Sequence, residues 1–273
     1  MTLLLVSLAG LGLFLWPFTG LGLPASTPAL ALAVGTTLVL LLVEVGQRRL
    51  DSRRLALLVT ISTIDAAMRA AVVTGIGGFS PTFFGILCGG YVLGPSFGFA
   101  CGTLSLLVSA VVTGGVGPWL PYQMLAAGWV GAGAGLAGLA RRHGRPGRPD
   151  LILLGAVGAV SGLAFGALLD VWDWTFFRAA PQLGWSPGLA PMVAATHFLR
   201  FYLATSLAYD SLRAVGNALM VAAFGLPVLC GLRRVAARFT VVLEAAAVET
   251  APPPAAEPRR RGVIPAAGGA RGR

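Results

Sequence analysis

Charged residues are scarce in this chain, and their scarcity excludes an ordinary soluble domain. Only 11% of the 273 residues are Asp, Glu, Lys or Arg, whereas a soluble domain carries about 25%. Hydrophobic residues account for 56% of the chain. A composition this apolar and this poor in charge indicates an integral membrane protein, and one compact helical unit suffices for its length.

Lysine is absent altogether, so arginine supplies all twenty basic residues, and the formal net charge is +10. A charge of this size is a common feature of proteins that bind nucleic acid. The arginines, however, lie in short loops between apolar runs and in the C-terminal tail. That placement predicts cytoplasmic loops that face anionic membrane lipids, with no nucleic-acid partner.

Cysteine and histidine are also rare. The three cysteines, Cys88, Cys101 and Cys230, are widely spaced in apolar stretches and form no C-x-x-C pair. We therefore expect buried free thiols rather than disulfides. His197 has no second ligand nearby, and His143 lies in an arginine-rich loop. The sequence thus predicts no metal site.

Recognisable catalytic motifs are missing as well. The chain has no Walker P-loop, no H-E-x-x-H pair and no serine-nucleophile motif in a recognisable context. We therefore expect no catalytic residue, no cofactor and no hydrolysis of ATP through a P-loop of this chain. Two alternatives stay open on the residues alone: an intramembrane enzyme, and a membrane scaffold subunit without a small-molecule substrate.

Long apolar runs dominate what is present. Runs of spanning length occur near residues 3–20, 28–46, 55–74, 82–113, 121–140, 151–171 and 211–232. A span needs about 20 residues, so the fourth run is too long for one helix, and Gly94-Pro95 divides it into two. The predicted fold is an all-α integral membrane protein of about eight transmembrane helices. The first run lacks a preceding basic region and is expected to be a retained span rather than a signal peptide.

The placement of arginine orients the predicted spans. Clusters occur within residues 48–54, 141–148 and 233–238, and all three are cytoplasmic if both termini are cytoplasmic. This pattern predicts a multi-pass protein of the prokaryotic cell membrane. Residues 192–206 are too short for a further span and contain Arg200. We expect them to form an interfacial or re-entrant helix on the outer side.

Two other segments border the predicted membrane surfaces. Trp172, Trp174 and Trp185 lie at the end of a span and in the outer loop, where an aromatic belt is expected. Residues 239–273 are predicted to be a disordered cytoplasmic tail. From Glu249 onward the chain is rich in Pro, Ala, Gly and Arg and cannot bury enough apolar surface to fold.

Polar residues inside the apolar runs are candidates for a binding site. Asp65 and Arg69 are four residues apart on one face of a helix, and Asp210, Arg213 and Asn217 descend one face of another. Each set has two interpretations. It either satisfies itself through an ion pair or an interhelical hydrogen bond, or it lines a ligand pocket.

An aromatic and amide cluster stands where an outer loop enters the run 121–140. Aromatic and amide side chains at a helix mouth can line a site for a small molecule. With the polar residues above, the predicted substrate-binding residues are Arg69, Trp119, Tyr122, Gln123, Asp210, Arg213 and Asn217.

Glycine is abundant and often recurs every fourth residue within the apolar runs. Small residues at this spacing let helix backbones approach closely in lipid. Packing surfaces are therefore predicted at Gly94, Gly98 and Gly102, at Gly131 and Gly135, and at Gly158, Gly162 and Gly166.

Several of these segments together resemble a known family. They read Ala66-Ala67-x-Arg69, Gly89-Gly90-Tyr91-Val92-Leu93-Gly94-Pro95, Phe97-Gly98-Phe99, Gly114-x-x-Gly117-Pro118-Trp119-x-Pro121-Tyr122-Gln123-Met124 and Tyr209-Asp210-x-x-Arg213-Ala214. Between about Leu55 and Arg234 the chain resembles the substrate-binding S component of energy-coupling factor (ECF) transporters. The Gly-Pro-Trp-x-Pro-x-Gln-Met segment is the most specific part of the likeness.

The resemblance implies a fold, an activity and partners. Residues 51–238 would form the six-helix S-component core, and residues 1–50 would form two additional N-terminal transmembrane helices. The protein would capture a vitamin or cofactor precursor in a pocket on the outer side. It would associate with a transmembrane T component and two cytoplasmic ATPase subunits. Family members dock on the T component through small residues of the first core helix, and the nearest equivalents here are Ser62, Ala66 and Ala70.

Overall fold

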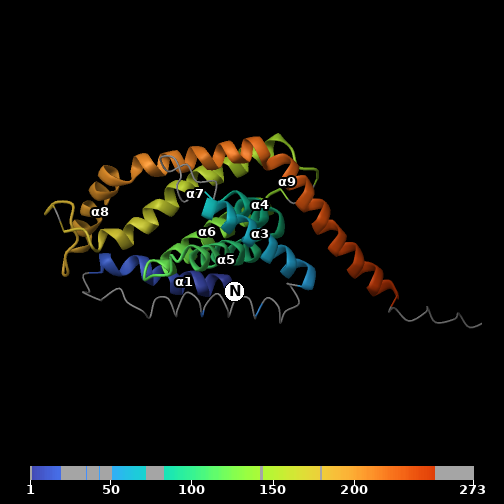
Figure 1. The fold of residues 1–273 in the computed structure, drawn as a ribbon, viewed down its shortest axis with the longest axis horizontal. Helices are drawn as coiled ribbons and strands as arrows, with labels where there is room; N and C mark the ends of the chain where they lie inside the picture. Colours follow the sequence, from blue (N-terminus) through green and yellow to red (C-terminus); the bar gives the residue numbers. More distant parts are fainter. Residues whose placement is uncertain are drawn as a thin grey trace, which may run out of the picture.

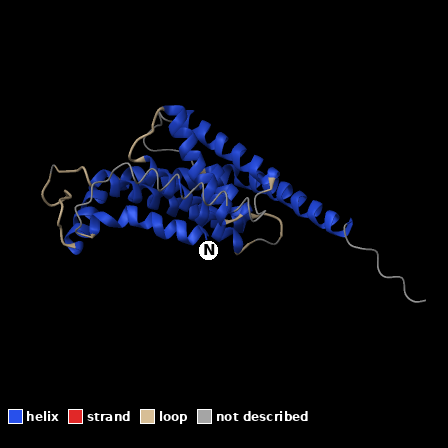
Figure 2. Ribbon diagram, turned by 90° about the horizontal axis from the view of Figure 1, so that it is seen from below, coloured by secondary structure: helices blue, strands red, loops and turns tan. Residues whose placement is uncertain are grey.

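The computed structural model describes residues 2–19, 35, 43, 51–71, 83–141, 144–178 and 180–249, and these residues form an all-α structure (Figures 1 and 2). The described residues contain eight α-helices and one short 3-10 helix. Their bounds are α1 (Thr2–Leu15), η1 (Trp16–Phe18), α3 (Ser52–Ala71), α4 (Phe84–Leu93), α5 (Pro95–Thr113), α6 (Leu120–Leu139), α7 (Arg148–Trp174), α8 (Pro191–Thr205) and α9 (Leu207–Glu249).

Three of these helices are long and apolar enough to cross a membrane: α5, α7 and the Leu207–Arg238 part of α9. They indicate a multi-pass membrane protein. Helix α6 is 20 residues long, but Tyr, Gln, Trp and five glycines dilute its apolar content, and it lies at the centre of the bundle. Of the predicted span 28–46, only Gly35 and Val43 fall within the described residues.

The predicted break at Gly94-Pro95 is confirmed. Gly94 has φ 100°, a left-handed conformation that glycine adopts without steric cost, and its N–H donates to the Gly90 carbonyl at 2.8 Å. Pro95 then begins α5, where its missing N–H costs no helical hydrogen bond. The chain therefore turns sharply between α4 and α5.

Glycine spacing sets the closest contact, between α5 and α6. A Cβ atom at Gly98 would collide with the carbonyl of Gly131, and one at Gly102 would collide with the carbonyl of Ala127. Gly135 packs in the same way against the backbone of Gly94 and Pro95. The predicted glycine surfaces of these two helices thus pack against each other, and only residues without a Cβ permit so close an approach.

The third glycine surface joins α7 to α9, which run side by side in Figure 1. Gly158 faces Asn217, Gly162 faces the backbone of Ala214, and Gly166 faces the Asp210 carboxylate. Helix α9 is 43 residues long and continues to Glu249. It therefore includes residues 239–249 of the predicted tail, whose Leu, Glu and Ala favour a helix.

The two ends of the bundle differ in chemistry. We call one the arginine end, because it carries Arg141, Arg145, Arg148 and Arg233. We call the other the aromatic end, because it carries Trp16, Trp119, Trp172, Trp174 and Trp185. Helix α8 packs at the aromatic end against η1 and the end of α7 (Figure 1).

Trp174 at the end of α7 and Trp185 in the following loop do not form a belt on the surface. Trp174 and Trp185 are buried in a small core of their own. Phe18 stacks on Trp174 at 5.5 Å between ring centroids, and the Trp185 indole N–H donates to the Pro17 carbonyl at 3.0 Å. The predicted aromatic belt is therefore wrong, because η1 folds over these rings and shields them.

Candidate functional site

A pocket of about 280 Å³ opens at the aromatic end, between the start of α6 and the end of α7. Trp119 and Gln123 line it from α6, and Leu169, Trp172 and Asp173 line it from α7. Two indole rings, one aliphatic side chain, one amide and one carboxylate therefore line the space. An apolar wall with a few convergent polar groups is the usual composition of a small-molecule site.

Local sequence holds the Trp119 ring in place. Its indole N–H donates to the Gly115 carbonyl at 3.2 Å. The ring lies against Gly117, where a Cβ would come within 2.5 Å of the indole carbons. Gly117 thus makes room for the tryptophan two residues later. The Gly-Pro-Trp sequence positions an aromatic ring that is 43% exposed at the pocket.

Tyr122 supports the pocket from behind rather than lining it. Its ring is 1% exposed and contacts Trp172 at 5.0 Å between centroids. Its hydroxyl accepts a hydrogen bond from the Trp16 indole N–H at 3.3 Å, and the Phe14 ring meets it edge-on at 5.2 Å. The described N-terminal segment, α1 and η1, therefore fixes Tyr122, and Tyr122 fixes one wall of the pocket.

Three other predicted site residues lie along the contact between α7 and α9. Asp210 forms an ion pair with Arg213 within α9. Arg213 also donates to the Gly162 carbonyl at 3.5 Å, and the Asn217 amide donates to the Gly158 carbonyl at 3.0 Å. An ion pair and interhelical hydrogen bonds are therefore both present in this group. None of the three lines the pocket that contains Trp119.

Arg69 and its neighbour Asp65 belong to this second region. The Asp65 carboxylate is 1% exposed and faces the first backbone N–H groups of α4, those of Gly85 and Ile86. Arg69 lies one helical turn away from Asp65 on the same helix. Arg69 in turn lies within electrostatic range of Arg213 on α9. The seven predicted residues therefore fall into two groups: Trp119 and Gln123 line the pocket with Tyr122 behind them, and Arg69, Asp210, Arg213 and Asn217 do not line it.

Sequence reasoning did not assign the α7 wall of the pocket. Trp172 was predicted only as part of an aromatic belt, and Leu169 and Asp173 were not assigned to a binding site. Trp172 and Asp173 follow Leu169 by three and four residues, which puts all three on one helical face. That spacing, with a tryptophan beside a carboxylate, is the signal that could have identified them.

The predicted docking surface on α3 is not on the exposed side of the helix. Ser62 and Ala66 are 2% and 4% exposed, and the Ser62 hydroxyl donates to the Cys101 carbonyl of α5 at 3.3 Å. The Ala70 side chain lies outside the described part of the structure. The correction has a simple cause, since small residues pack helices within a protein as readily as between proteins. The exposed small residues in the middle of α3 include Ala56, Thr60, Thr63 and Ala67.

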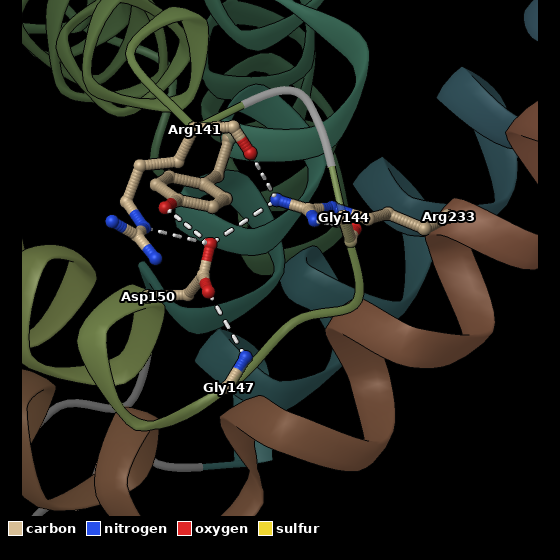
Figure 3. A network of polar contacts seen from close by, with 6 residues as sticks. Arg141, Gly144, Gly147, Asp150 and Arg233 are labelled. Atoms are coloured by element: carbon tan, nitrogen blue, oxygen red, sulfur yellow. Dashed lines mark hydrogen bonds and ion pairs between the residues drawn. The ribbon is translucent and has the colours of Figure 1, made fainter.

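A polar network at the arginine end is centred on Asp150 and was not predicted from the sequence (Figure 3). The Asp150 carboxylate, 2% exposed, accepts hydrogen bonds from the Tyr91 hydroxyl at 2.8 Å and the Gly147 N–H at 2.9 Å. Arg233 and Arg141 approach it at 3.1 and 3.5 Å. Arg233 also donates to the carbonyls of Arg141 at 2.8 Å and Gly144 at 2.7 Å.

This network brings two of the predicted arginine clusters together. Arg141 lies just after α6, at the start of the loop that leads to α7. Arg233 lies on α9, 83 residues beyond Asp150. Arg141 and Arg233, one from each cluster, therefore lie at the same end of the bundle. A buried carboxylate with four charge-assisted partners ties α4, α7 and α9 at this end.

Comparison of the chain with models of protein families, with curated proteins and with solved structures found no match in any of the three. Within the described residues, no group of three or more His, Cys, Asp or Glu side chains is placed to hold a metal ion. The three cysteines are free thiols. The site has therefore to be interpreted from its own residues.

Proposed function

We propose that the protein is a membrane-embedded substrate-capture subunit of an ECF-type importer, which takes up a vitamin or cofactor precursor and has no catalytic activity of its own. One observation carries the proposal. The segment most specific to that family, around Trp119 and Gln123, forms one wall of a preformed pocket at the aromatic end. The Trp119 indole ring is held by Gly115 and Gly117 of the same segment.

In this proposal the arginine end faces the cytoplasm and the aromatic end faces outside. Arginine-rich loops are retained on the cytoplasmic side of membrane proteins, where they meet anionic lipids. The pocket then opens toward the outer surface, where a substrate arrives. The chain has eight spans with both termini cytoplasmic, of which residues 51–238 form the six-helix core and residues 1–50 precede it.

The partners in this proposal are a transmembrane T component and two cytoplasmic ATPase subunits. Because Ser62 and Ala66 are buried, the exposed face of α3 is the better candidate for docking. Ala56, Thr60, Thr63 and Ala67 are exposed and recur at intervals of four, three and four residues, which places them on one helical stripe. Small side chains on such a stripe permit close approach by a second transmembrane helix.

Ligand capture by the purified protein tests the proposal. The protein is purified in detergent, the co-purified small molecule is identified by mass spectrometry, and its affinity is measured by calorimetry. Trp119→Ala and Gln123→Ala should each weaken binding at least tenfold, since losing one buried contact costs ~1–3 kcal/mol. The control is Arg145→Ala, which changes an exposed residue at the arginine end and should leave affinity unchanged.

Two outcomes would contradict the proposal. If the protein retains no ligand and supports no uptake together with a T component and ATPases, it is a scaffold rather than a capture subunit. If the purified protein alone converts a small molecule into a product, it is an intramembrane enzyme. Wild-type affinity in both pocket variants would place the site elsewhere.

A further inference from the structure

The pocket between α6 and α7 differs in charge from the rest of the molecule. The chain has twenty basic residues and ten acidic residues. The described residues that line the pocket include the Asp173 carboxylate and no arginine. A binding site on a strongly basic protein therefore has a negatively charged wall.

The Asp173 carboxylate is available to a ligand. It is exposed at the mouth of the pocket. The ion pairs among the described residues join Asp150 to Arg141 and Arg233, and Asp210 to Arg213, without involving Asp173. No arginine among the described residues forms an ion pair with the Asp173 carboxylate. Its negative charge is therefore free to attract a cationic ligand.

The two tryptophans that share the pocket with Asp173 are held in position before any ligand arrives. Trp119 is fixed by its hydrogen bond to the Gly115 carbonyl and by contact with Gly117. Trp172 is packed between Tyr122 and Phe176, at 5.0 and 4.9 Å between ring centroids. Fixed rings lose little entropy on binding. Indole faces attract cations through the negative face of the ring system.

From these observations we infer that the ligand of this pocket is a planar organic cation with one or two fused rings. The inference rests on the proposed function of the pocket as the capture site. The exposed Trp119 ring would contact the planar ring system, and the Trp172 ring would border it. Asp173 would neutralise its charge, and Gln123 would donate to or accept from a ring substituent. A cavity of roughly 150 Å³ holds benzene, so about 280 Å³ accommodates a fused bicyclic system.

Three probes of matched shape test the charge of the ligand. Protein freed of its co-purified ligand is titrated by calorimetry with 1-methylquinolinium, neutral 2-methylquinoline and anionic quinoline-2-carboxylate. The cation should bind at least tenfold more tightly than either other probe. Asp173→Asn should weaken binding of the cation at least tenfold and of the neutral probe less than threefold.

Two further variants complete the test. Trp119→Leu keeps apolar bulk but removes the aromatic face, and it should weaken binding of the cation at least fivefold. Asp51→Asn is the matched control, because it makes the same change of charge at the exposed N-terminus of α3, away from the pocket. It should leave the affinity for all three probes within twofold of wild type.

The inference and the proposed function fail in different ways. Equal or tighter binding of the neutral or anionic probe, unchanged affinity in Asp173→Asn, or no binding of any probe would overturn the inference. Identification of an anionic or uncharged natural ligand would also overturn it, while leaving the proposed function intact. A protein that captures no natural ligand and supports no uptake overturns the proposed function itself.

Discussion

At the scale of single residues, the Asp150 carboxylate has four polar partners. It connects Tyr91 of α4, Gly147 before α7, and Arg233 of α9. We predict that Asp150→Ala lowers the free energy of unfolding by about 3 kcal/mol, the low end for breaking a buried ion pair. Arg233 keeps two carbonyl acceptors in that variant, which limits the loss. Unfolding in mixed detergent micelles measures the effect.

Two variants control this measurement. Tyr91→Phe removes one hydrogen-bond donor to the same carboxylate and should cost about 1 kcal/mol. Arg145→Ala lies in the neighbouring loop at an exposed position and should change stability little. An Asp150→Ala protein as stable as wild type would show that this network does not hold the arginine end together.

At the scale of elements, the contact between α5 and α6 depends on missing side chains. Gly131 and Gly133 lie two residues apart on α6, and both are helical. A Cβ at Gly131 would strike the Gly98 carbonyl, whereas one at Gly133 meets nothing within 4 Å. We predict that Gly131→Ala destabilises the protein by about 1–3 kcal/mol, the usual cost of overpacking. Gly133→Ala should be neutral or stabilising, because alanine favours a helix.

Gly131→Ala and Gly133→Ala make the same substitution in the same helix, so helix propensity affects both variants equally. Any difference in stability between them therefore comes from packing. Thermal unfolding in detergent gives the comparison directly. Equal melting temperatures for the two variants would mean that α5 and α6 do not pack as closely as the structure has them.

At the scale of the whole molecule, the two chemically distinct ends define a direction across the membrane. Arg145 and Ser186 are exposed in loops at the arginine and aromatic ends respectively. Single cysteines at these positions should react with a membrane-impermeant maleimide from opposite sides, with Ser186→Cys labelled from outside. Labelling of both from outside intact cells would refute the proposed orientation.

The exposed stripe on α3 makes a second prediction about the assembled molecule. Ala67→Trp should weaken association with a T component at least tenfold in a pull-down, because a bulky ring prevents close helix approach. Ligand affinity should stay within twofold of wild type, because Ala67 does not line the pocket. Ile152→Trp on the exposed face of α7 is the control and should leave the complex intact. Unchanged association of Ala67→Trp would exclude this stripe as the docking surface.

Helix positions were largely predictable because their signals are local. Apolar runs gave α5, α6, α7 and most of α9, and Gly94-Pro95 gave the break before α5. The Asp210–Arg213 pair followed from helical spacing alone. The glycine surfaces were predicted from four-residue repeats. The repeats did not indicate which helix packs against each glycine surface.

What the sequence by itself determined is therefore the helical, membrane-embedded character of the chain, the main turns and the candidate residues. Only the tertiary structure decided which candidates meet. It brought Trp119 and Gln123 into one pocket with Asp173, left Asp210 and Arg213 outside that pocket at the contact between α7 and α9, and turned Ser62 inward. The physical reason is that periodicity specifies which face of a helix a residue occupies, whereas the neighbour of that face depends on close contacts between segments far apart in the chain.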